Sequence, residues 1–218
     1  MNVKKINTQI ELDEIGLDFI GKIEIYGKNI ILKKKYPNSS VVARENSSVE
    51  AWENSSVVAW ENSSVVAREN SSVVARGFSQ VCIFSNLVKI TTFEMGRYIK
   101  PNENINNFAI YHSLEIKDNH IIMYKSVNTD LASFYDSNFK YEVGKIFVHE
   151  CDTSVEKNCS FGLHVSSIDF ANNFALEKVG KNNFKILECF VPLDKIVLPI
   201  NSNGKIRTSE LYVNRIVE

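Results

Sequence analysis

A pattern of eight residues repeats five times without a break between Asn38 and Gly77. Each repeat begins Asn-Ser-Ser-Val, has alanine at its sixth position and has arginine or tryptophan at its seventh. Asn, Ser and β-branched Val are weak helix formers, whereas a short Ser-Val-Val-Ala strand followed by a Glu-Asn-Ser turn accounts for the whole repeat. A short fixed period is typical of stacked coils, so the pattern predicts a β-solenoid.

The alternation along each repeat predicts which side chains point inward. Positions four and six are always Val and Ala. Since side chains two apart share a face of a strand, these small residues and the second-position Ser are expected to fill a narrow interior. The fifth position accepts a charge, because Glu50 replaces valine there, and is expected to lie outside. Eight is an even number, so this facing is the same in every repeat.

The outward Arg and Trp residues predict two repeats per coil. Trp60 would then lie between Arg44 and Arg76 on one face, while Trp52 would lie against Arg68 on the other. Each vertical pair is a cation–π contact worth about 0.5–1 kcal/mol at an exposed site. Three repeats per coil would instead stack two arginines, which repel each other. These five residues either stabilise the stack or form an interaction surface, since Arg and Trp are typical of protein interfaces.

The alternation extends beyond the perfect repeats on both sides. We therefore expect an amino-terminal cap over residues 1–17 and a solenoid over residues 18–94, with the perfect repeats at 38–77. From residue 95 the pattern is more varied and predicts a small α+β domain over residues 95–218. The predicted fold class is thus mainly β, with a short two-sided β-solenoid of octapeptide repeats followed by an α+β domain.

Within the carboxyl-terminal part, one helix and several strands are predicted. Apolar residues at helical spacing follow Ser167, which suits an N-cap, and end at Gly180, which suits a helix terminus. Strand patterns lie at 120–127, 141–149, 184–192 and 210–217.

Composition and charge narrow the function classes. The chain has 218 residues, 44% of them hydrophobic, and 25 Lys and Arg against 26 Asp and Glu. These values exclude a wholly disordered chain and disfavour a dedicated nucleic-acid binder. Direct contact of the Arg column with the phosphates of a nucleic acid has weak support. No apolar run approaches the ~20 residues of a membrane helix. Four scattered cysteines are typical of a reducing compartment, so we expect a cytoplasmic protein with no membrane partner.

Three further motifs carry a resemblance to a family. They are Tyr124-Lys125, then Cys-Ser-Phe-Gly-Leu-His from Cys159 through Gly162 to His164, and then the segment from Glu188 to Pro199. Together with the octapeptides, they resemble uncharacterised phage and prophage proteins that join tandem octapeptide repeats to a Cys-x-x-Gly-Leu-His domain. The resemblance implies a phage context and the cytoplasm of a bacterial host, and it assigns no reaction or role to Tyr124, Cys159, Gly162 or His164.

Metal and nucleophile chemistry are alternatives for this region. His149, Cys151, Cys159 and His164 have the side chains that zinc prefers, but their spacing matches no recognised zinc motif. Cys159 with His164 could act as a nucleophile and its base. On a strand, His164 would lie on the face opposite Leu163 and Val165, which favours a structural histidine. We therefore expect no metal and no cofactor.

A second alternative rests on the order of residues. Lys125 on an early strand, Ser166 before a helix and a late Glu210 resemble the layout of ADP-ribosyltransferase-like domains. In those domains NAD is held by three elements: an early basic residue or histidine, a strand that contains a serine, and a late glutamate. Here a lysine stands at the first position and the closing Glu-x-Glu is missing, so the sequence does not establish an enzyme.

The favoured hypothesis is a phage-derived binding protein that engages a host protein or ribonucleoprotein. Inhibition of a host defence system, as by an anti-CRISPR protein, is one version of it. An ADP-ribosyltransferase-like enzyme and a structural virion component are the alternatives.

Overall fold

The computed structural model describes residues 2–217, and the chain divides into two compact units after Pro101. The first unit is a β-solenoid of about 6 turns, and the second is a small antiparallel sheet domain with a helix. The prediction of a mainly β chain with these two parts is therefore confirmed.

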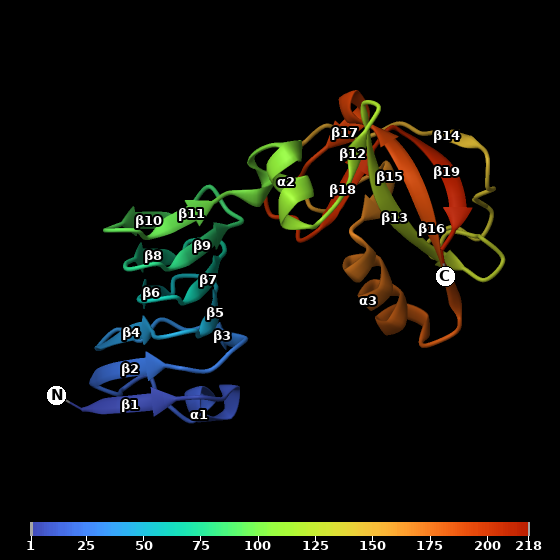
Figure 1. Cartoon of the computed structure of the whole chain (residues 1–218). Helices are drawn as coiled ribbons and strands as arrows, with labels where there is room; N and C mark the ends of the chain where they lie inside the picture. Colours follow the sequence, from blue (N-terminus) through green and yellow to red (C-terminus); the bar gives the residue numbers. More distant parts are fainter. Residues whose placement is uncertain (1, 218) are drawn as a thin grey trace. The chain divides into compact units, whose positions relative to one another are not determined.

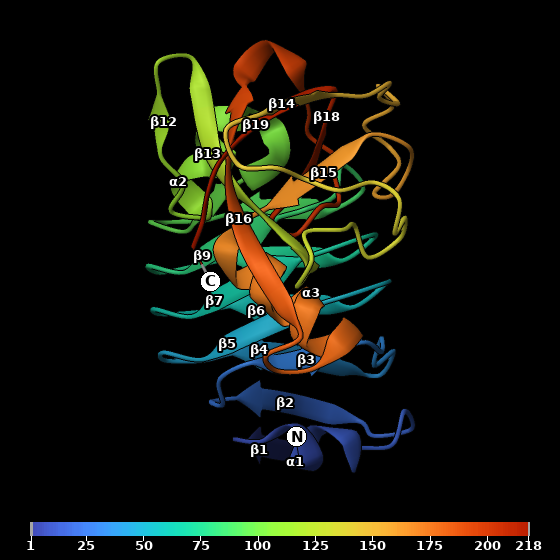
Figure 2. The ribbon, with the colours of Figure 1, turned by 90° about the vertical axis from the view of Figure 1, so that its right-hand side faces the viewer.

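Each coil of the solenoid contributes one strand to each of two parallel sheets (Figure 1). The strands of the first sheet are, in order, β1 (Val3–Ile6), β2 (Gly21–Ile25), β4 (Ser39–Ala43), β6 (Ser56–Ala59), β8 (Ser72–Ala75) and β10 (Lys89–Thr92). Those of the second are β3 (Ile30–Leu32), β5 (Ser48–Ala51), β7 (Ser64–Ala67), β9 (Gln80–Ile83) and β11 (Arg97–Ile99). The stack thus begins at β1 and continues to β11, beyond residues 18–94 on both sides. Figure 2 shows the successive coils from a second direction.

A short helix, α1 (Gln9–Asp13), follows β1 at the amino-terminal end of the stack. It begins at Thr8, whose side chain accepts a hydrogen bond from the Glu11 backbone while the Glu11 carboxylate accepts one from the Thr8 backbone. This capping box satisfies backbone donors that a helix cannot pair internally. Leu12 of the helix is 2% exposed and belongs to the solenoid core, so α1 covers the apolar end of the first coils.

The pairing register confirms two octapeptides per coil. Ser48 on β5 lies opposite Ser64 on β7, and Ser56 on β6 lies opposite Ser72 on β8. Identical positions therefore stack on one another. The parallel ladder places equivalent side chains directly above each other, which is the arrangement that the Arg and Trp columns predicted.

The Arg and Trp columns form continuous cation–π ladders. The Trp60 ring lies 5.8 Å from the Arg44 guanidinium carbon and 5.3 Å from that of Arg76. On the other sheet, the Arg68 guanidinium carbon lies 5.0 Å from the Trp52 ring, and its Nε donates to Glu50 at 2.6 Å. Since these side chains are half-buried or buried and contact each other, their observed role is to join successive coils.

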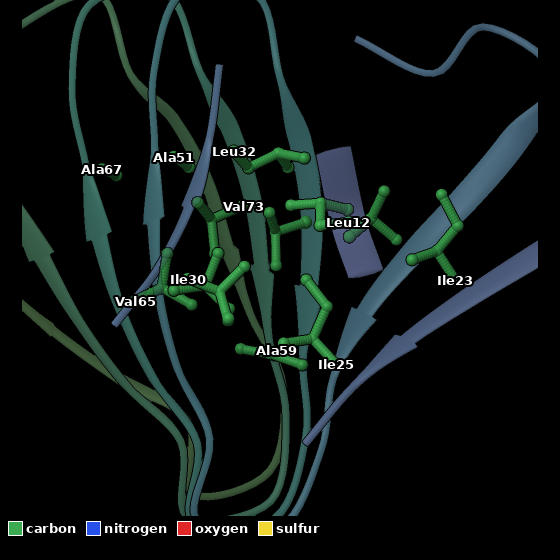
Figure 3. Packing of buried hydrophobic residues seen from close by; sticks show 14 of the residues in the cluster. Leu12, Ile23, Ile25, Ile30, Leu32, Ala51, Ala59, Val65, Ala67 and Val73 are labelled. Atoms are coloured by element: carbon green, nitrogen blue, oxygen red, sulfur yellow. The ribbon is translucent and has the colours of Figure 1, made fainter. Parts of the chain in front are cut away.

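The interior is narrow because its side chains are small. The alanines at the sixth position of the repeats are 0% exposed, and the valines at the fourth position are 4% exposed or less. Figure 3 shows Ala51, Ala67, Val65 and Val73 between the two sheets, together with larger residues from the first coils such as Leu12 and Ile23. Such close packing leaves little room for larger side chains.

Glutamates form the corners between strands. Glu45, Glu53, Glu61 and Glu69 have φ angles of 54°, 53°, 59° and 50°, a left-handed conformation that is uncommon outside glycine. Gly77 adopts φ 63° at the same position of the last repeat. The Glu61 carboxylate accepts a hydrogen bond from the Glu45 backbone N–H of the neighbouring coil at 2.6 Å, so the corners are also joined vertically.

We predict that Ala67→Leu lowers the free energy of unfolding of the solenoid by about 1–3 kcal/mol, because overpacking strains a closed interior. Val66→Thr, on the outer face next to it, should change it by less than about 0.5 kcal/mol. Both tryptophans of the chain lie in the solenoid, so tryptophan fluorescence during urea unfolding follows this unit selectively. Equal urea midpoints for the two variants would contradict the assigned facing.

The second unit is built on one antiparallel sheet. Its strand order is β14-β19-β16-β13-β15-β18-β17, and β12 pairs with β13 at the side. The strands are β12 (Ile116–Lys117), β13 (His120–Asn128), β14 (Ile146–Val148), β15 (Leu163–Ser166), β16 (Phe184–Pro192), β17 (Ile196–Val197), β18 (Lys205–Thr208) and β19 (Glu210–Ile216). The helices are α2 (Ile105–Tyr111) and α3 (Ile168–Val179), with short 3-10 turns at Pro101–Glu103 and Leu193–Lys195.

The helix predicted after Ser167 is confirmed as α3. The Ser167 side chain accepts a hydrogen bond from the Phe170 backbone, and Gly180 follows the last helical residue with φ 78°. Ala171 and Ala175 are the buried residues of α3, which packs on β13 (Figure 1). The opposite face of the sheet carries the main core of this unit, which includes Phe108 of α2.

The strand predicted over residues 141–149 forms only at its end, as β14. Gly144 breaks the alternation with φ 85°, and Tyr141 is instead buried in an aromatic group with Phe139 and Phe147. The strand β18 was not predicted, because its four residues, Lys-Ile-Arg-Thr, have little apolar pattern.

Candidate functional site

A pocket opens in the second unit where two neighbouring strands separate. The strands β13 and β15 pair at one position only, Tyr124 with Ser166. Continued antiparallel pairing would place Ser126 opposite His164, but the ladder stops before that point. The pocket at this gap has a volume of about 590 Å³ and is lined by residues of β13, β15, β18, α3 and the intervening loops. This volume suits a small-molecule ligand.

Lys125 crosses the gap between the strands. On β13 it shares a face with the core residues Met123 and Val127, because residues two apart face the same way. Its Nζ donates to the His164 backbone oxygen at 2.9 Å and lies 5.1 Å from the centre of the Tyr141 ring. Burial lowers the pKa of Lys125 to about 8. The lysine therefore supplies a hydrogen-bond donor to the His164 carbonyl, next to the point where the ladder between β13 and β15 stops.

His164 lines the pocket from the other strand. As predicted, its side chain lies on the face of β15 opposite the core residues Leu163 and Val165. Burial, followed by the nearby charges of Lys205 and Lys125, lowers the pKa of His164 to about 4. The imidazole is therefore uncharged at neutral pH. Its buried Nε2 atom has no hydrogen-bond partner within residues 2–217.

Aromatic side chains form one wall of the pocket. Phe170 and Phe174 of α3 stack with ring centres 6.4 Å apart and planes within 10°. Phe134 and Tyr135, from the loop after β13, lie 6.1 and 6.3 Å from Phe174. Tyr135 is 77% exposed, so this wall reaches the surface. Flat apolar rings around an open pocket provide surfaces on which a ligand ring can stack.

Another part of the lining belongs to a loop organised by Asp152. Its carboxylate accepts hydrogen bonds from Ser160 Oγ at 2.6 Å, from the Ser154 backbone at 2.9 Å and from Lys157 Nζ at 3.0 Å. These three donors hold the pKa of Asp152 far below its usual range. The acid thereby closes the loop that brings His149, Cys159 and Ser160 to the pocket.

Arg207 holds the same loop from beneath. It lies on β18, paired with His164, and is 0% exposed. Its guanidinium donates to the backbone oxygens of Asp152, Ser154 and Lys157. A buried arginine with three carbonyl acceptors fixes the path of the backbone, since its rigid guanidinium donates in several directions at once.

Cys159 and Lys205 meet at the pocket. Lys205 Nζ donates to Cys159 Sγ at 2.9 Å.

Gly162 has φ 132°, and a Cβ there would lie 2.9 Å from Cys151 Sγ, so a larger residue would displace the loop. No disulfide joins the four cysteines of the described chain.

The structure brings together part of each predicted set of residues. Lys125 and Ser166 line the pocket, whereas Glu210, at the start of β19, does not. Tyr124, Cys159, Gly162 and His164 all border the pocket. The five Arg and Trp residues belong to the ladders of the solenoid.

Several residues of the site were not predicted from the sequence. Tyr141, Phe174 and Lys205 line the pocket and Arg207 supports it. The sequence places them far from Lys125 along the chain, and only the pairing of β15 with β18 brings Lys205 and Arg207 to the site. A weak signal was present, because Phe170 and Phe174 are one helical turn apart on α3.

Comparison with models of known protein families, with curated proteins and with solved structures finds no match to this chain. Within residues 2–217, no group of three or more His, Cys, Asp and Glu side chains is arranged to hold a metal ion. None of the helices described in this range has the length and apolarity to span a membrane.

We predict that Arg207→Met lowers the free energy of unfolding of the second unit by at least about 3 kcal/mol, because it removes three hydrogen bonds made by a fully buried guanidinium to backbone carbonyls. Hydrogen exchange should accelerate first at the amides of residues 150–161. The matched variant Lys140→Met removes an exposed pair with Asp130 at 2.6 Å and should cost less than about 1 kcal/mol. Unchanged exchange in residues 150–161 would show that Arg207 does not hold the loop.

Proposed function

We propose that the second unit binds a small anionic ligand that carries an aromatic ring, of the nucleotide type. The observation that carries this proposal is the presence of two unlike kinds of group in the lining of one pocket: the stacked aromatic rings of Phe170 and Phe174, and the ammonium groups of Lys125 and Lys205. Aromatic faces bind bases by stacking, and ammonium groups bind phosphates.

The charge balance of the pocket supports an anionic ligand. Among the described residues that line it, Asp136 has the one carboxylate, against two lysines. His164 is uncharged near neutral pH, so it does not repel the ammonium groups of Lys125 and Lys205. Its Nε2 atom has no partner among the described residues, which leaves it for a hydrogen bond to a ligand. Arg207, close behind, adds a further positive charge to the field.

NAD is the first member of this ligand class to test. Lys125 and Ser166 occupy the positions that the ADP-ribosyltransferase-like layout assigns to NAD binding, and both line the pocket. Glu210 lies outside it, so the acid that such a transferase needs is missing from the described lining. We therefore propose ligand binding and not group transfer as the function of this pocket.

Calorimetric titration with AMP, ADP-ribose and NAD tests the proposal. We expect at least one of them to bind, and we expect Phe174→Ala and Lys205→Ala each to weaken it about tenfold, which is about 1.4 kcal/mol. Lys145→Ala is the matched control, because Lys145 is exposed, pairs with Glu142 and does not line the pocket. No binding by the unaltered protein, or equal affinity in all variants, would refute the proposal.

The solenoid supports a second candidate function, binding of a macromolecular partner. Its outer face carries half-buried Val58 and Val74 beside the ladder of Arg44, Trp60 and Arg76. A flat, rigid face of this composition resembles protein interfaces. The resemblance to phage proteins makes a host protein or ribonucleoprotein the proposed partner, and inhibition of host defence is one version of this proposal.

We expect Val58→Glu with Val74→Glu to abolish capture of a host partner from bacterial lysate while the protein stays folded. The repeats already accept glutamate at this position, as Glu50 shows, so tryptophan fluorescence should confirm the fold. Val66→Thr on the other sheet is the control. Capture of the same partner by the double glutamate variant would exclude this face.

A further inference from the structure

We propose that Lys125 is a covalent attachment site, whose amine forms an imine with an aldehyde or ketone group on a ligand of the pocket. This inference rests on the proposed function, because it assigns one more chemical feature to the same ligand. It is motivated by the surroundings of Lys125 in the pocket, which differ from those of an ordinary surface lysine.

The first observation is the setting of the amine. Lys125 lies on the core face of β13, between Met123 and Val127 in the alternation, and next to the buried Tyr141 ring. No carboxylate within residues 2–217 forms an ion pair with it, and its hydrogen bond goes to the neutral carbonyl of His164. An ammonium without a counter-ion in an apolar wall loses its proton more readily than one in water.

The second observation is access. Lys125 is half-buried and is one of the residues that line the pocket, so its side chain borders the space in which a ligand would bind. Many buried lysines are inert because nothing reaches them, whereas this one stands at a gap between strands. Nucleophilic lysines are activated by this combination of desolvation and access to a substrate.

The reaction needs no oxidant, reductant or cofactor. The ammonium first releases its proton to solvent, and the free amine lone pair then forms a bond to the carbonyl carbon. The nitrogen gives up its two protons and the carbonyl oxygen takes up two. The carbon–oxygen bond then breaks, the oxygen leaves as water, and the remaining C=N bond is the imine. The uncharged His164 imidazole, which lines the same pocket, can exchange protons during the loss of water.

Pyridoxal 5′-phosphate is a suitable probe, because it joins an aromatic ring, a phosphate and an aldehyde. The protein is incubated with the probe, the imine is reduced with cyanoborohydride, and labelled peptides are located by mass spectrometry. We expect the first equivalent of label on Lys125 and a slower reaction when AMP is present. Lys125→Arg, which retains a donor for His164, should lose this label, whereas Lys145→Arg should not.

The pH dependence separates a reactive amine from general labelling. Labelling of Lys125 should rise with pH and reach half its maximum near 8. Three ionisable groups around Lys125 have pKa values far from 8, since burial raises the pKa of Tyr141 and of Cys189, the latter to about 12, and lowers that of His164 to about 4. Exposed lysines should instead label increasingly up to a pH near 10.

The outcomes distinguish the two proposals. If the probe competes with AMP but label is spread over surface lysines and spares Lys125, the imine proposal is overturned and the nucleotide pocket stands. If the probe does not label Lys125, and none of AMP, ADP-ribose and NAD binds, both proposals fall. If the Lys125→Arg variant does not fold, the position of the first label on the unaltered protein decides.

Discussion

Every buried backbone carbonyl and N–H group needs a partner, and this constraint accounts for both units of the protein. In the solenoid, each strand between the end coils pairs with the coil above and the coil below. At the corners of Glu45 and Gly77, a glutamate carboxylate of the next coil accepts the backbone N–H. In the second unit, Lys125 donates to a carbonyl where the β13–β15 ladder stops, and Arg207 donates to three carbonyls of the loop between β14 and β15. The pocket is thus a place where regular pairing has been replaced by basic side chains.

This replacement explains why the site is positively charged. Backbone carbonyls require donors, and the long side chains that can reach several of them are lysine and arginine. The same groups that complete the fold therefore create a field that attracts anions, without a separate cluster of charges for binding. Asp152, outside the lining, is engaged with three donors of its own loop, one of them the Lys157 ammonium, which leaves Asp136 as the one carboxylate among the described residues that line the pocket.

The two units differ in how much of them could be predicted from the sequence. In the solenoid, the period of eight gives the strands, the facing of Val and Ala, and even the pairing of Trp60 with Arg44 and Arg76, because each contact repeats along the chain. In the second unit, the helix after Ser167 could be predicted from its caps and spacing. The site could be predicted only in part, since Lys125, Ser166 and His164 stand in patterned strands, whereas Lys205 and Arg207 reach it through a strand with little pattern. Long-range pairing of this kind leaves no local signal.

The coil of two octapeptides has a consequence for changes in the length of the solenoid. Loss or gain of one octapeptide would keep Val and Ala inside but transfer every later strand to the opposite sheet, so the surfaces of the two sheets would exchange. Loss or gain of a pair would leave each strand in its sheet and change the stack by one coil, about 4.8 Å. The pair is therefore the unit by which such a chain can vary in height while each face keeps its composition.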